Sequence, residues 1–167
     1  MVTSTKLSLI EIARRVRSDL TEHFDDKFSF SVNTVQDGDP TGLVAITVTQ
    51  WPDAMEMLSR EFIRDNYLAV LEGRMTEMSP TLMLSKNAEE IVWDIRSILD
   101  CYVKVYINPK TGLEERNFIS DIAFSQTGLV KERRRLIDEC KQSFRHNSQL
   151  SGWPEYKSDH EETKHGK

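Results

Sequence analysis

Residues 28–49 read FSFSVNTVQDGDPTGLVAITVT, and this stretch decides the fold. Apolar side chains alternate with polar ones near both of its ends, at Phe28, Phe30, Val32, Val44, Ile46 and Val48. Such alternation is typical of strands that bury one face. The residues between them, QDGDPTG, are those that turns require. The stretch therefore predicts a β-hairpin with one apolar side.

Helical patterns lie on both sides of this hairpin. Ser8 and Glu11 have the spacing of a capping box, which predicts the start of an amphipathic helix that ends near Phe24. After the hairpin, Trp51-Pro52-Asp53 predicts the start of a second helix, with Asp53 as its cap. Residues 67–71 (YLAVL) could continue that helix or form a separate strand, because so short an apolar run does not fix its own period.

The second half of the chain repeats the order of helix, strand and strand. Asn87 and Glu90 predict the cap of a helix that reaches Leu99. The segments that follow are expected to be a strand at 102–107 with Val103, Val105 and Ile107 buried, a turn at 108–112, a strand at 114–124 with Phe118, Ile122 and Phe124 on one face, and a helix at 129–144.

These patterns predict one α+β domain over residues 1–145. Antiparallel β-hairpins would form a sheet packed by amphipathic helices, in the order α-β-β-α-(β)-α-β-β-α. Duplication of a unit spanning 7–72 and 87–145 would explain the similar halves, and the limited vocabulary of helices and turns is the competing explanation. Residues 146–167 are polar and are expected to be a flexible tail.

Composition limits the class of protein. With 167 residues, 38% of them hydrophobic and 29% charged, the chain is typical of a soluble globular domain. No apolar run is long enough to span a membrane, and the first residues lack the apolar stretch of a signal peptide. Cys101 and Cys140 are too few for a disulfide scaffold. A cytoplasmic protein without membrane contact is expected.

Residues that could support catalysis or hold a metal are poorly placed. The chain has no phosphate-binding glycine motif, and no two of its four histidines have zinc-ligand spacing. Asp37 and Asp39 flank a glycine as in a calcium loop, but the later glutamate that would complete such a loop is missing. We therefore expect no catalytic residues, no metal and no cofactor, and a chain that is not an enzyme.

An excess of aromatic and methionine side chains in residues 51–84 suggests a surface for a protein partner or for a second copy of the chain. Methionine adapts to varied partners, although it also fills ordinary cores, and core filling is the simpler interpretation. The candidate partner-binding residues are Trp51, Tyr67, Met75, Met78 and Met83.

Nucleic-acid binding is the alternative function. Two basic clusters, on the first and last predicted helices, could form one phosphate-binding stripe if both helices packed on the same face of the sheet. The residues involved are Arg14, Arg17, Arg133, Arg134 and Arg135. Residues 25–128, however, hold nine Lys and Arg against seventeen Asp and Glu, and the net charge of the chain is -5. This acidic balance disfavours nonspecific binding to phosphate.

The second half, from the helix that begins near Asn87 to the helix that ends at Phe144, resembles the C-terminal part of YbjN-like proteins in its order of elements. These proteins share the fold of class I type III secretion chaperones. The resemblance implies a strand at 67–71 as the third strand of that fold. It also implies a non-enzymatic, often dimeric protein whose sheet or helix surface holds a partner polypeptide.

Overall fold

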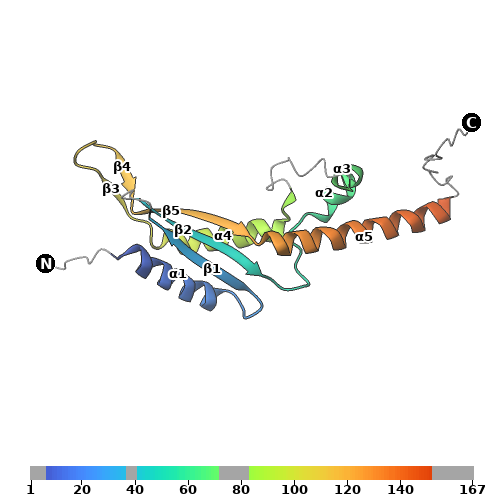
Figure 1. Ribbon diagram of the computed structural model, residues 1–167, viewed down its shortest axis with the longest axis horizontal. Helices are drawn as coiled ribbons and strands as arrows, with labels where there is room; N and C mark the ends of the chain where they lie inside the picture. The colour runs from blue at the N-terminus through green and yellow to red at the C-terminus, as the bar shows by residue number, and fades with distance from the viewer. Residues whose placement is uncertain (1–6, 37–40, 72–82, 152–167) are drawn as a thin grey trace, which may run out of the picture.

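The computed structural model describes residues 7–36, 41–71 and 83–151 (Figure 1). Helices and strands occur together, which confirms the α+β class. In chain order the elements are α1 (Leu9–His23), β1 (Ser29–Val35), β2 (Gly42–Gln50), α2 (Arg60–Asp65), α3 (Tyr67–Leu71), α4 (Lys86–Asp100), β3 (Val105–Ile107), β4 (Glu114–Arg116), β5 (Phe118–Phe124) and α5 (Gln126–Ser151).

The predicted first hairpin forms β1 and β2, which pair antiparallel from Ser29 opposite Gln50 to Val35 opposite Leu43. A third strand, β5, adds to β2 in the parallel direction, so the main sheet has the order β1-β2-β5. The expected all-antiparallel sheet is therefore wrong, and the sheet is mixed. The parallel pair arises because the chain passes through α4 before it returns to the sheet, as parallel strands require.

One face of the main sheet is buried under α1 and α4. The predicted apolar positions of β2, Val44, Ile46 and Val48, are fully buried there. They pack with residues that recur at helical spacing on the two helices, at Ile12, Ala13, Val16, Leu20, Ile91, Ile95 and Leu99. We call this part of the molecule, made of α1, α4, β1, β2 and β5, the sheet body.

The predicted second hairpin is divided between two sheets. β3 and β4 form a small antiparallel sheet of their own, whereas β5 continues into the main sheet. The break lies at Asn117, whose side chain accepts from the Lys104 N–H and donates to the Tyr102 carbonyl. Val105 and Ile107 are 56% and 67% exposed, so their predicted burial is wrong. Of the proposed duplicated halves 7–72 and 87–145, the first has two strands between its helices and the second has three, and their strands pair differently.

The helix caps are partly as predicted. The Ser8 hydroxyl accepts from the Glu11 N–H at the start of α1, while the Glu11 carboxylate binds Arg14 and Arg15 instead of completing the capping box. α4 begins earlier than predicted, because Ser85 and not Asn87 is its cap.

The helix predicted to begin at Trp51 is wrong. Residues 51–59 form an irregular segment, and α2 begins only at Arg60, capped by Ser59. The irregular segment pairs briefly with residues 83–85 through hydrogen bonds from the Ser59 N–H to the Met83 carbonyl and from the Ser85 N–H to the Met57 carbonyl. In residues 51–59, these hydrogen bonds to a distant segment of the chain take the place of the backbone hydrogen bonds of a helix. Residues 67–71 are helical, so the strand implied there by the resemblance is absent.

The last helix is longer than predicted and reaches Ser151, so residues 146–151 are helical and residues 152–167 lie outside the described ranges. Figure 1 shows α5 leading away from the sheet with α2 and α3 beside it. We call α2, α3 and α5, together with the adjoining residues Leu58 and Met83, the helical arm. Its separate small core consists of Leu58, Ile63, Met83, Leu136 and Cys140.

Candidate functional site

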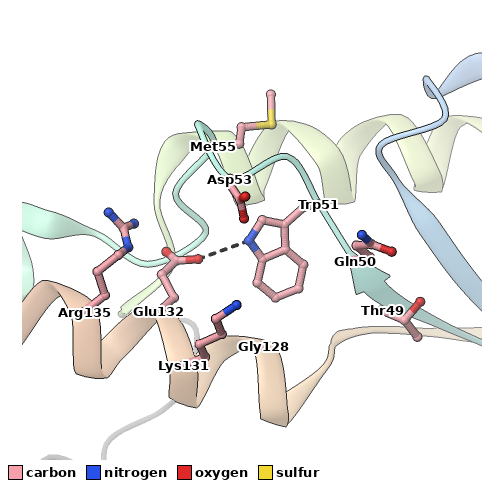
Figure 2. A pocket seen from close by; sticks show the side chains of 9 residues that line it. All are labelled: Thr49, Gln50, Trp51, Asp53, Met55, Gly128, Lys131, Glu132 and Arg135. Atoms are coloured by element: carbon pink, nitrogen blue, oxygen red, sulfur yellow. Dashed lines mark hydrogen bonds between the residues drawn. The ribbon is translucent and has the colours of Figure 1, made fainter.

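Trp51 lies at the junction between the sheet body and the helical arm. Its Nε1–H donates to Oε2 of Glu132 over 3.2 Å, as Figure 2 shows. Its ring meets the Phe124 ring edge to face, with centroids 5.9 Å apart. A Cβ added to Gly128 would stand 2.5 Å from the indole, so α5 approaches the ring closely only because this position is glycine. Trp51 therefore has a structural role at the junction.

Glu132 is the polar centre of this junction. The side chain is only 6% exposed, although it carries a carboxylate. Its second oxygen accepts from the buried Leu58 N–H over 2.8 Å. Buried carboxylates are costly unless they are hydrogen-bonded, and here both oxygens have a donor. One side chain of α5 thus fixes both the indole and the irregular segment before α2.

A hollow of about 470 Å³ opens beside the junction (Figure 2). Its size is that of a small-molecule site. The buried polar groups around it, however, are already engaged with one another, and Arg135 on its rim is paired with Glu56 and Glu139. Among the described residues, no buried side-chain nitrogen or oxygen of this hollow is left without a hydrogen-bond partner for a ligand to satisfy.

The three predicted partner-binding residues that the structure describes, Trp51, Tyr67 and Met83, do not form one exposed surface. Met83 is 8% exposed and belongs to the core of the helical arm, as its simpler interpretation predicts. Tyr67 lies on α3 and contacts the ring of Phe144, with centroids 5.4 Å apart. Met75 and Met78 lie outside the described residues.

The two basic clusters are largely engaged in contacts within the chain. On α1, Arg14 pairs with Glu11, and Arg17 donates to the Val32 carbonyl of β1 over 2.8 Å. On α5, Arg135 pairs with two carboxylates, while Arg133 is half-buried and Arg134 is exposed. Figure 1 shows α1 along the sheet and α5 leading away from it. These pairings weigh against a phosphate-binding stripe.

The face of the main sheet opposite α1 and α4 carries exposed apolar side chains. Val35, Leu43 and Ile119 lie side by side across the three strands in the pairing register. Val35 and Ile119 are exposed, Ile119 to 55%, and Leu43 is half-buried. The next row, Asn33, Ala45 and Asp121, is polar at both ends. No helix or strand of the described residues covers this face of the sheet, and the face is apolar at one end.

The small sheet of β3 and β4 exposes a second apolar surface. Val105 pairs with Arg116 and Ile107 pairs with Glu114, so these four side chains share one face. All four are exposed. A two-stranded sheet with three residues in each strand is not stable in water without further packing. A cover for this face would supply that packing.

The side chains that could hold a metal ion are not grouped in the described residues. Within residues 7–36, 41–71 and 83–151, no three His, Cys, Asp or Glu side chains are grouped as a metal site. Cys140 is buried in the arm, and Cys101 is exposed at the end of α4. No helix of the described part is long and apolar enough to cross a membrane.

The chain matches no protein-family model, no curated protein and no solved structure. The resemblance to YbjN-like proteins therefore stays a prediction.

The sequence patterns did not predict two features of the molecule, the buried carboxylate of Glu132 and the exposed apolar residue Ile119. The burial of Glu132 has no local signal, because its donors are 74 and 81 residues away. Ile119 does have one: it is a large apolar residue at a position of alternate phase to Phe118, Ile122 and Phe124, which indicates a strand with apolar residues on both faces.

Proposed function

We propose that this chain is a chaperone-like protein-binding module that holds a partner polypeptide and converts no substrate, and that it acts as a homodimer in the cytoplasm. The observation that supports the first part is the uncovered face of the main sheet, with its apolar row of Val35, Leu43 and Ile119. A sheet that leaves one face open offers side-chain contacts to a partner there, and its edge strands offer backbone groups.

The homodimer is supported by the charges on the face of β3 and β4. This face carries Glu114 and Arg116 beside the apolar pair Val105 and Ile107. In a twofold dimer the same patch meets itself, so Glu114 of each copy can lie opposite Arg116 of the other copy while the apolar side chains pack between them. The patch is thus complementary to a second copy in both charge and polarity.

Light scattering during size-exclusion chromatography tests the homodimer. The natural chain should elute as a dimer, and Glu114→Arg or Arg116→Glu alone should give monomers because like charges would then meet. The double variant, E114R with R116E, should restore the dimer, and Glu89→Arg on α4 is the matched control. A monomeric natural chain, or single variants that remain dimeric, would overturn this interface.

An array of seven-residue peptides tests the holding of a polypeptide. Purified chain should bind a subset of extended, apolar-containing peptides, and Ile119→Asp should reduce the bound signal at least tenfold. Ile10→Ser removes a still more exposed apolar side chain, on α1, and should leave binding unchanged. If the array binds nothing above background, the chain is not a polypeptide-binding module.

A further inference from the structure

The two edges of the main sheet differ in how their backbone groups are used. At the β1 edge, Arg17 of α1 reaches over the strand and donates to the Val32 carbonyl. A charged side chain placed there occupies an acceptor that another strand would need. The β1 edge is therefore closed to strand addition at its centre.

At the β5 edge the outward backbone groups can be identified from one hydrogen bond. The Ser125 N–H donates to the Val48 carbonyl of β2 over 2.9 Å. In a parallel pair the residues of a strand direct both backbone groups alternately toward and away from the neighbour. Ser125 and every second residue before it thus face β2, and Phe118, Ser120, Ile122 and Phe124 direct their N–H and C=O groups outward. Phe118 and Phe124 are buried, so Ser120 and Ile122, in the middle of the strand, supply the outward groups that a further strand can reach. Within the described ranges, no hydrogen bond from another element reaches these groups.

The side chains of β5 give this edge a chemical preference. Asp121 stands exposed at the middle of the strand, and its neighbours across the sheet are Ala45 and Asn33. Neither neighbour is charged, so the sheet supplies no cation for this carboxylate. Opposite charges on directly paired residues stabilise two strands, and like charges destabilise them. Ile119, two residues earlier on the same face, is exposed and apolar.

We propose that β5 receives an extended segment of the partner polypeptide as a fourth strand, with Lys or Arg opposite Asp121 and an apolar residue opposite Ile119. This inference rests on the proposed function and names the chemistry of its partner. A second copy of β5 does not fit this edge equally well, because the centred antiparallel pairing would bring two Asp121 carboxylates together. The partner segment therefore reads as an apolar residue two positions from a basic one.

Fluorescence anisotropy with two labelled peptides, TVTKTVT and TVTETVT, tests this inference. The natural chain should bind the lysine peptide at least tenfold more tightly than the glutamate peptide. Asp121→Lys should reverse that preference, whereas Asp121→Asn should remove it. The reversal is the decisive result, because a variant that simply failed to fold would bind neither peptide.

A second variant tests the backbone contact. Ser120→Pro deletes an N–H that points away from β2, and proline is tolerated on an edge strand at such a position. It should abolish binding of the lysine peptide, while Ser120→Ala retains it, with unfolding midpoints measured for both. If peptides bind but neither D121K nor S120P changes their affinity, the β5 edge is not the site although the protein-binding function stands. If no peptide binds here or on the array, the proposed function itself fails.

Discussion

The sheet body and the helical arm bury their apolar side chains in different ways. In the body, α1 and α4 pack against one face of the main sheet. The core between them consists of many fully buried side chains of α1, α4 and β2. The arm has a core of five buried residues, and it meets the body through the hydrogen bonds of Glu132 and through Leu129, which packs against both cores. The junction concentrates two buried hydrogen bonds on one carboxylate, so the loss of that carboxylate leaves two buried donors without an acceptor. The arm should therefore open before the body.

Removing the junction carboxylate should have the largest effect. Glu132→Ala leaves the buried Leu58 N–H and the Trp51 Nε1–H without an acceptor, which should cost about 3 kcal/mol. Urea denaturation followed by circular dichroism measures this loss. The thiol of Cys140, buried in the arm, should also react faster with a thiol reagent, while Cys101 is already exposed.

Glu139→Ala is the matched control for this prediction, because it removes another carboxylate from α5. Glu139 pairs with Arg60 and Arg135 at the surface, where an ion pair contributes less than about 1 kcal/mol. If E132A and E139A unfold at the same urea concentration, the junction does not hold the arm. Hydrogen exchange adds the location: it should accelerate in α2 and α5 but not in α1.

Gly128→Ala tests the same junction by steric pressure. The new methyl group would lie within 2.5 Å of the Trp51 ring, so either the indole or α5 has to move. Overpacking of this kind should cost about 2 kcal/mol. Urea denaturation measures the cost, and a shifted indole N–H resonance in the NMR spectrum locates it at Trp51. Thr127→Ala changes the neighbouring exposed residue and should leave both unchanged.

The same contrast explains how much of the fold could be predicted. The body follows from local periodicity: the alternation in residues 28–49 and the helical spacing after Ser8 each specify a buried face, and both faces exist. The parallel addition of β5 could not be predicted, because alternation indicates which face of a strand is buried but not which strand lies beside it. In the arm, the apparent cap at Asp53 was overridden by tertiary contacts of Met57 and Leu58.

The candidate site was less predictable than the fold. The methionine-rich segment 51–84 indicated a partner surface, yet Met83 proves to be core, since apolar residues fit either role. The open sheet face and the β5 edge depend on which elements cover which strands, and that is a property of the three-dimensional arrangement. Three apolar residues that are out of phase with the buried residues of their strands, Val35, Leu43 and Ile119, mark this face in the sequence.

Within the body, a polar contact should make stability depend on alkaline pH. Tyr102 donates its hydroxyl proton to Asp19, and burial together with this hydrogen bond raises the pKa of Tyr102 to about 12. The unfolded chain ionises first, near the usual pKa of 10, so the free energy of unfolding should fall as the pH rises from 10 to 12. Tyr102→Phe should lose about 1 kcal/mol at neutral pH and lack this part of the decline.

Denaturation of the natural chain and of Y102F at several pH values measures the difference between their free energies of unfolding. The titration of all other groups contributes equally to both proteins and cancels in this difference. Tyr67→Phe is the control, because it removes the hydroxyl of another half-buried tyrosine, on α3. A difference between natural chain and Y102F that stays constant up to pH 12 would contradict the role of Asp19.

The smallest effect is expected at the surface of α1. Hydrogen bonds from Arg14 and Arg15 lower the pKa of Glu11 to about 2, so this carboxylate favours the folded state above its ordinary pKa of 4.5 and loses that contribution as the pH falls toward 2. Arg14→Ala should raise the pKa of Glu11 in an NMR titration of the carboxyl carbons while the unfolding midpoint hardly changes, because exposed ion pairs contribute little to stability.

In the arm, the pKa of Glu56 is likewise lowered, by Arg60 and Arg135, but these residues connect the segment before α2 to α5. Arg60→Ala should therefore raise the pKa of Glu56 and also speed hydrogen exchange in the arm, and a purely local response at both sites would show that the two regions do not differ in this respect.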